Sequence, residues 1–217
     1  MIFASILVAC KPNEPAVPVS PITVLYTEAA VPWLPGLYVC AGDRTVNAVQ
    51  RAANLIDLQS GELAMEIGAS PGGITTAYQI GSEDIVVIFN PRNPVQLLTA
   101  GQVRGLFTGL ITSWEAVGGS KAPVDVWVFS PGEDIQQVFM TTFLAGSAIT
   151  SNARLATSME EMRQEIAGDV TSVGILTRSW MTDDLSTAYS ITGLPVLVLS
   201  QGEPQDVIQG IISCLQK

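Results

Sequence analysis

"NPVQLLTAGQVRGLFTGLITSWEAVGG", residues 93–119, combines the signals of a turn, a helix and a second turn. It opens with an Asn-Pro turn, and Thr99 then stands where a helix cap is expected. Val103, Leu106 and Phe107 have the i, i+3, i+4 spacing of an amphipathic helix, which the Gly two residues later is expected to end. A capped helix between a turn and a Gly pair indicates an ordered part of a globular domain.

Apolar runs flank this stretch on both sides and predict strands. "DIVVIFNP" at 84–91 is continuous, as in a strand buried on both faces, and "VDVWVFS" at 124–130 is rich in Val. Further strands are expected at 22–26, 45–52, 63–70 and 172–177, and two short ones at 188–191 and 195–200 around a turn at Thr192-Gly193. Helices are expected at 31–40, from Asn54, and at 133–146, 158–168 and 204–216. Strands that alternate with helices predict an α/β architecture.

The composition excludes several classes of protein. The 217 residues suffice for one large domain or two small lobes with a sizeable core. Ten Lys and Arg against twenty Asp and Glu give a net charge of −10, which disfavours binding to nucleic acid. The chain has no His, so its own side chains cannot form a Ser-His-Asp triad, a Cys-His dyad or a His-based zinc site.

No pattern in the chain predicts catalysis, a metal or a cofactor. The neighbouring acids Asp183-Asp184 and Glu160-Glu161 are expected to point apart, and no motif places a nucleophile beside a base. Asp and Glu oxygens also lack the spacing of a metal-binding loop. We therefore expect a protein that is not an enzyme.

The first residues resemble an export signal. Leu7-Val8-Ala9-Cys10 is similar to a bacterial lipobox, in which the Cys is lipidated and becomes the mature N-terminus. "KPNEPAVPVSP" follows, a Pro-rich spacer suited to hold a domain away from a membrane. Residues 1–21 are thus predicted to be a signal and spacer that anchor the protein to the outer face of the cell membrane. The alternative is a buried N-terminal strand.

Two cysteines remain if Cys10 is lipidated. An even pair in an exported protein favours a disulfide, here between Cys40 and Cys214, which would tie the last helix to the first. The alternative is two buried free thiols.

Several segments together resemble one family. Residues 86–119, followed by "APVDVWVFSPGEDIQQVF", resemble the phosphate-type periplasmic substrate-binding proteins of bacterial ABC transporters. That family has a strand ending in Asn-Pro, a helix, a "W…GG" segment, a strand and a loop "GSGTR". "GDVTSVGILTRSWM", "LQSGELAMEIGAS" and "PVLVLSQGEPQDVIQGIISCL" are similar to other family segments, so the resemblance covers nearly all of residues 22–217.

The resemblance implies a two-lobed type II periplasmic-binding-protein fold, α/β with mixed, mainly parallel sheets and a ligand cleft between the lobes. The first lobe would comprise 22–86 plus 190–217, and the second 87–189. Hinge strands near 84–90 and 189–199 would allow closure on the ligand.

The opening stretch itself has two interpretations. In the favoured one, Trp114, Phe107 and Leu106 pack the second lobe while Gly118-Gly119 makes a tight turn. In the other, the segment is a binding surface.

Ligand contacts are expected where strands end and helices begin, because free backbone N–H groups point outward there. Three places fit: the loop after the first strand, the loop at 68–70 and the loop at 130–135. The predicted ligand-binding residues are Thr27, Glu28, Ala29, Ala69, Ser70, Ser130, Gly132, Glu133 and Asp134.

The third loop departs from the family pattern. When Phe139 is aligned with the family's Phe, residues 132–136 stand against Gly-Ser-Gly-Thr-Arg, so Glu133, Ile135 and Gln136 replace the Ser, Thr and Arg. A phosphate needs donors and benefits from an Arg, whereas carboxylates repel it.

Two hypotheses follow from this departure. In the first, a cationic or polyhydroxylated ligand is bound by Glu28, Glu133 and Asp134 together. In the second, Glu133 and Asp134 merely occupy the first turn of a helix, where acidic side chains are favourable. In the second case the cleft binds a small anion through backbone N–H groups and Ser130, or binds nothing.

The function that these patterns predict is an extracytoplasmic solute-binding lipoprotein that delivers a small solute to an ABC permease. The resemblance favours phosphate or another oxyanion as the solute. The alternative is a sensory or adhesion lipoprotein that keeps the fold with a degenerate anion site.

Overall fold

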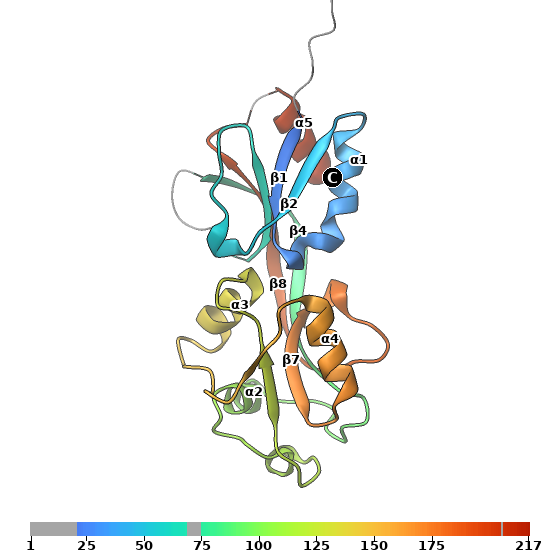
Figure 1. Ribbon diagram of the computed structural model, residues 1–217, viewed down its shortest axis with the longest axis vertical. Coiled ribbons are helices and arrows are strands. Elements are labelled where there is room, and N and C mark those ends of the chain that lie inside the picture. The colour runs from blue at the N-terminus through green and yellow to red at the C-terminus, as the bar shows by residue number, and fades with distance from the viewer. Residues whose placement is uncertain (1–20, 69–74, 205) are drawn as a thin grey trace, which may run out of the picture.

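The computed structural model describes residues 21–68, 75–204 and 206–217. The predictions for Cys10, the spacer, Ala69 and Ser70 therefore lie outside the described residues. Figure 1 shows two groups of elements along the long axis of the molecule, joined by two long strands. We call residues 21–68, 75–83, 194–204 and 206–217 the upper half, and residues 84–193 the lower half.

The strands are β1 (Ile22–Tyr26), β2 (Val46–Gln50), β3 (Leu63–Ile67), β4 (Thr75–Phe89), β5 (Asp125–Val128), β6 (Arg154–Leu155), β7 (Ser172–Thr177) and β8 (Ser186–Gln201). They form one eight-stranded sheet in the order β2-β1-β3-β8-β4-β7-β5-β6. β1 is parallel to β2 and β3, and β5 is parallel to β6 and β7. The pairs between β3, β8, β4 and β7 at the centre are antiparallel. The prediction of an α/β fold with a mixed sheet is confirmed.

The long strands correct the sequence prediction. β8 is one strand through both halves, where two short strands with a turn at Thr192-Gly193 were expected, and β4 begins nine residues before Asp84. The break is absorbed as an irregularity: Gly193 has a φ of +76°, and the β4–β8 register shifts between Glu83 and Ile85. The Gly193 amide also donates to Asp84 Oδ1 at 3.2 Å, so β8 stays bound to β4 across the bulge.

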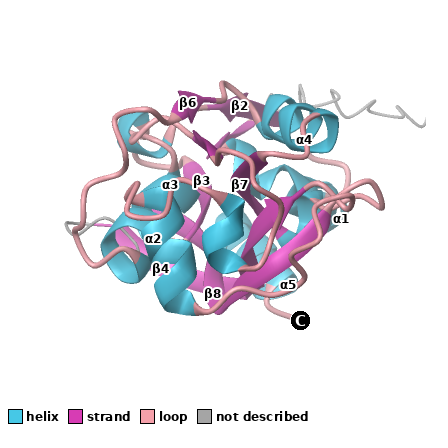
Figure 2. Cartoon of the chain, turned by 90° about the horizontal axis from the view of Figure 1, so that it is seen from below, coloured by secondary structure: helices cyan, strands magenta, loops and turns pink. Residues whose placement is uncertain are grey.

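The helices are α1 (Leu34–Ala41), α2 (Ala100–Phe107), α3 (Asp134–Val138), α4 (Met159–Gly168) and α5 (Asp206–Leu215), with 3-10 turns η1 (Glu28–Trp33), η2 (Ala53–Leu55), η3 (Trp114–Val117) and η5 (Arg178–Trp180) and a π turn η4 (Phe139–Phe143). Figure 2 shows helices on both faces of the sheet, with α2 and α3 on one side and α1 and α4 on the other. The helix expected from Asn54 is only the short η2. Within the described residues, no helix is both long and apolar enough to cross a membrane.

The caps of two helices follow from the sequence. The Gln102 amide donates to Thr99 Oγ1 at 3.2 Å, and the Thr99 amide donates to the Gln102 side chain at 2.8 Å. The Glu161 amide likewise donates to Ser158 Oγ at 3.1 Å at the start of α4. The bonds are reciprocal at α2 only, because the Glu161 side chain accepts from the Thr157 amide instead, and they fix where α2 and α4 begin.

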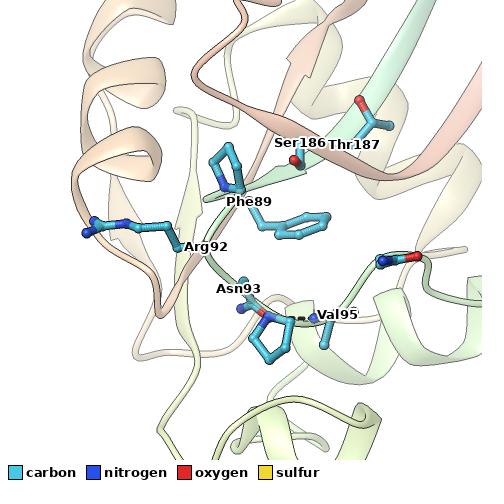
Figure 3. A pocket seen from close by; sticks show the side chains of 9 residues that line it. Phe89, Arg92, Asn93, Val95, Ser186 and Thr187 are labelled. Atoms are coloured by element: carbon cyan, nitrogen blue, oxygen red, sulfur yellow. Dashed lines mark hydrogen bonds between the residues drawn. The ribbon is translucent and has the colours of Figure 1, made fainter.

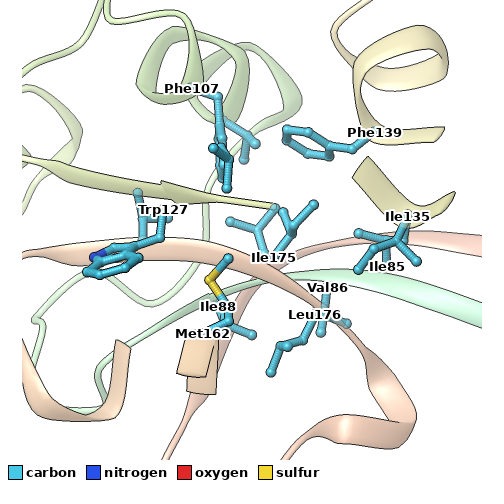
Figure 4. Close-up of a cluster of buried hydrophobic side chains, with 14 of the residues drawn as sticks. Ile85, Val86, Ile88, Phe107, Trp127, Ile135, Phe139, Met162, Ile175 and Leu176 are labelled. Carbon is cyan, nitrogen blue, oxygen red and sulfur yellow. The ribbon is translucent and has the colours of Figure 1, made fainter. Parts of the chain in front are cut away.

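The opening stretch packs the lower half. Trp114 is fully buried and donates from Nε1 to the Thr171 carbonyl at 2.8 Å. The Phe107 and Phe139 rings lie edge to face at 4.7 Å in the apolar cluster of Figure 4. A Cβ on Gly119 would lie only 2.9 Å from the Trp114 Cβ, so the turn needs Gly. The packing interpretation of this segment is confirmed.

The cysteine prediction is also confirmed. Cys40 in α1 and Cys214 in α5 form a disulfide, with their Cα atoms 5.7 Å apart. The bond joins two helices that pack side by side at the top of Figure 1. It links positions 174 residues apart in the sequence.

Candidate functional site

One carboxylate joins the two halves. Asp134, the first residue of α3, belongs to the lower half and is 4% exposed. Its Oδ2 accepts a hydrogen bond from Thr27 Oγ1 at 2.6 Å and another from the Ile67 amide at 2.8 Å, both in the upper half. Its Oδ1 accepts from the Ile135 amide at 2.8 Å. Figure 1 shows α3 at the waist of the molecule, directly below the upper half.

The topology explains this convergence. β1 and β3 are parallel neighbours, so their carboxyl ends, at Thr27 and Ile67, lie at the same edge of the sheet. α3 follows β5 after a turn in which the Glu133 amide donates to the Ser130 carbonyl at 3.0 Å. Three chain segments that are distant in sequence thus reach the same point.

Gly68 permits the close approach of β3 and α3. Its φ is +106°, a conformation that L side chains rarely adopt. A Cβ at this position would lie 2.3 Å from Val138 Cγ2. Any larger residue would therefore push the end of β3 away from α3.

A second contact between the halves involves the loop after β5. The Asn54 amide donates to the Gly132 carbonyl at 3.1 Å. A Cβ on Gly132 would lie 2.5 Å from Asn54 Oδ1, so η2 sits directly against this loop. The halves are in contact here without space for a side chain.

A further acid lies on the other side of the junction. Glu28 begins η1 in the upper half, near Met159, the first residue of α4 in the lower half. Burial raises the pKa of Glu28, and the backbone of Met159 opposes that rise.

Four carboxyl groups lie in or beside these contacts. Burial raises the pKa of Asp134, against the lowering effect of its bonds from Thr27 and the backbone. Burial, and then the Asp134 charge, raise the pKa of Glu66 to about 7, and its buried Oε1 has no hydrogen-bond partner. Burial raises the pKa of Glu133, and the charges of Asp134 and Glu28 raise it further.

These acids lack compensating cations. Among the described residues, the ion pairs join Arg154, Arg163 and Arg178 to other carboxylates. The described part of the chain also contains no group of three His, Cys, Asp or Glu placed to hold a metal ion. Among the described residues, an anion entering the junction would thus meet several acids and no cation of these ion pairs.

Gln136 occupies the position of the family's Arg but does not face a ligand. It is fully buried, and its Oε1 accepts a hydrogen bond from the Phe129 amide at 2.9 Å. Its Nε2 is buried without a partner. The side chain thus binds its own loop rather than replacing the positive charge.

The structure brings together some of the predicted residues. Thr27, Asp134 and Gly132 contribute to the contacts between halves, and Glu28 lies beside them. Ala29 is a buried packing residue, whereas Ser130 is exposed and its hydroxyl accepts a long, 3.5 Å bond from the Gly132 amide. Glu133 is half-buried beside them.

Sequence reasoning missed the Ile67 amide, Glu66 and Asn54. The acid within the apolar strand "LAMEI" was a signal for Glu66. The other two contribute backbone amides, which no residue type reveals.

A separate hollow of ≈ 450 Å³ lies in the lower half at the Asn-Pro turn, away from the predicted residues. Figure 3 shows side chains that line it, among them Phe89, Arg92, Ser186 and Thr187. The turn is held by the Val95 amide, which donates to Asn93 Oδ1 at 3.1 Å. These residues shape the end of β4.

Comparison with known proteins identifies the family. Residues 56–212 match the model described as a PBP superfamily domain. The chain is 24% identical over 117 residues to the phosphate-binding protein PstS of Bacillus subtilis, a match that covers 54% of this chain and 39% of that protein. The chain thus spans well under half the length of this curated relative.

Solved structures share the fold. A putative phosphate ABC transporter substrate-binding protein with bound phosphate from Clostridium perfringens superposes with a TM-score of 0.75 at 18% identity, over 90% of this chain and 93% of that one. The reduced form of the OxyR regulatory domain from Pseudomonas aeruginosa superposes with a TM-score of 0.59 at 10% identity, over 90% and 94%. The names of the transporter-related proteins agree with the prediction of a binding protein without a chemical step. Since the family model spans most of its residues, the chain belongs to the PBP superfamily, with a fold like that of phosphate-type substrate-binding proteins.

Proposed function

We propose that this chain is the extracytoplasmic solute-binding protein of an ABC transporter and holds a small solute between two lobes. The lobes are residues 22–86 plus 190–217 and residues 87–189. The observation that carries this proposal is the convergence of Thr27, Ile67 and α3 at one point between halves that are connected by β4 and β8. Two crossing strands allow such halves to open and close as units.

The cellular setting extends the same proposal. Cys10 is lipidated and holds the domain at the outer face of the membrane, and an ABC permease receives the solute. The disulfide supports export, because such bonds persist in oxidising compartments. Labelling cells with an alkyne fatty acid tests the anchor: the full chain should become labelled and Cys10→Ser should not.

A second candidate function is a sensory or adhesion protein that binds no transported solute. The observation in its favour is that the Asp134 carboxylate already accepts the hydrogen bonds of Thr27 Oγ1 and the Ile67 amide. The use of this fold by a regulatory domain shows that the fold alone does not imply transport.

Calorimetric titration of the full chain distinguishes the two. The panel contains phosphate, sulfate, molybdate, divalent cations, polyamines and sugars. Saturable one-to-one binding that weakens in Thr27→Ala and not in the exposed control Asp183→Asn supports the solute-binding function. Absence of binding to every member supports the non-transport alternative.

A further inference from the structure

We propose that Asp134 is an internal ligand: its carboxylate occupies the donors that an incoming oxyanion would need and so excludes oxyanions from the cleft. This inference rests on the proposed solute-binding function and assigns the residue that determines its specificity. The inference applies to the unaltered chain, in which the two halves are in contact through Asp134.

The contacts around Asp134 are those of a bound anion. A hydroxyl and a backbone amide of the upper half donate to one oxygen at 2.6 and 2.8 Å, and the Ile135 amide donates to the other oxygen at 2.8 Å. Charge-assisted bonds of this length are among the stronger hydrogen bonds in proteins. Thr27 and Ile67 flank the ends of neighbouring parallel strands, where ligands of open α/β sheets bind.

The space around this carboxylate is closed to a competitor. Asp134 is 4% exposed, and Gly68 and Gly132 bring the backbone into contact with Val138 and Asn54. An oxyanion that displaced Asp134 would leave that carboxylate beside it, without the hydrogen bonds that it now accepts from Thr27 and Ile67. Like charges in a buried site repel strongly.

Glu28 adds an acid at the start of η1, close enough to Glu133 for its charge to raise the pKa of that residue. An incoming oxyanion would therefore meet acids of the chain on this side as well.

Removal of the carboxylate tests the proposal. Asp134→Gly empties the position and places there the residue that the family pattern has. The full chain carrying this change should bind inorganic phosphate at least about 100-fold more tightly than the unaltered chain, because three donors are freed and one like charge is removed. Hydrogen exchange at the Ile67 amide should accelerate about tenfold or more, since that amide loses its acceptor.

Two further variants control this experiment. Asp134→Ala also removes the carboxylate and suits a helix better than Gly, so it must show phosphate binding above that of the unaltered chain even if the Gly variant does not fold. Asp183→Asn removes an exposed charge elsewhere and should change neither phosphate binding nor Ile67 exchange.

The outcomes separate this inference from the proposed function. Phosphate binding by the unaltered chain as tight as that of the Gly variant overturns the internal ligand and leaves the proposed function intact. Folded variants that gain no phosphate affinity also overturn it. The proposed function fails separately, if the unaltered chain binds no solute of the panel.

Discussion

The pH dependence of stability should be dominated by buried acids, and Glu66 gives a prediction with a magnitude. Its pKa is raised from the usual 4.5 to about 7, by burial first and by the Asp134 charge second. An acid with a raised pKa in the folded protein stabilises the fold fully below about pH 4.5, where folded and unfolded chains are both protonated. As the pH rises to about 7, the unfolded chain ionises first and this stability is lost.

The size follows from the pKa difference. A rise from 4.5 to about 7 corresponds to roughly 3 kcal/mol at 1.36 kcal/mol for each pKa unit. Glu66→Gln removes the titrating group and keeps its shape. The free energy of unfolding of this variant, relative to the unaltered chain, should therefore increase by about 3 kcal/mol between pH 4.5 and pH 8.

Urea unfolding of the full chain at several pH values, with the disulfide intact, measures this difference. Glu28, Glu133 and Asp134 also have raised pKa values. Because both chains contain these three acids, most of their contribution cancels in the difference between the two free energies of unfolding. The exposed Asp183→Asn serves as the matched control. A difference between Glu66→Gln and the unaltered chain that stays constant over this range would refute the assignment of a buried, protonated Glu66.

Three further predictions concern the contacts that hold the fold. Replacing Cys40 and Cys214 by Ser should lower the free energy of urea unfolding by up to about 5 kcal/mol, because the bond closes a loop of 174 residues; an unchanged value contradicts this. Gly68→Ala should lower the melting temperature, with a cost of about 1–3 kcal/mol from the positive φ and the clash with α3, whereas an unchanged melting temperature means that β3 and α3 are less closely packed. Thr27→Val should destabilise the chain by about 1–3 kcal/mol, since the buried carboxylate of Asp134 loses a donor, and an equally stable variant shows that this bond does not hold the halves together.

The lower half could be predicted well because its signals are local. The Thr99 cap, the apolar stripe of α2 and the Trp114 segment depend on neighbouring residues, and the structure confirms each. The single long β8 was missed, since Thr192-Gly193 has the composition of a turn. Only its pairing with β4 shows that the Gly lies in a bulge, and pairing over a hundred residues is not visible in a local pattern.

The sequence predicted which loops form the candidate site, but not the hydrogen bonds between them. The ends of β1 and β3 and the start of α3 were expected to face the cleft, because parallel strands place their carboxyl ends together. The partners of Asp134 could not be read from residue types, since one of them is the Ile67 backbone amide. Whether the acids of the third loop repel a ligand or bind the chain itself depends on the distance between the halves, which no local pattern contains.

The departures from the family pattern become consistent once each side chain is followed to its partner. Gln136, at the Arg position, accepts a bond from the Phe129 amide, so the loop binds itself where the family presents a cation. Asp134, at a Gly position, accepts bonds that a ligand would otherwise receive. A lost Arg alone would leave a weak anion site, and an added acid alone would leave an unpaired buried charge. Because the acid is satisfied by donors of the other half while the Arg is absent, the proposed internal ligand accounts for both changes together.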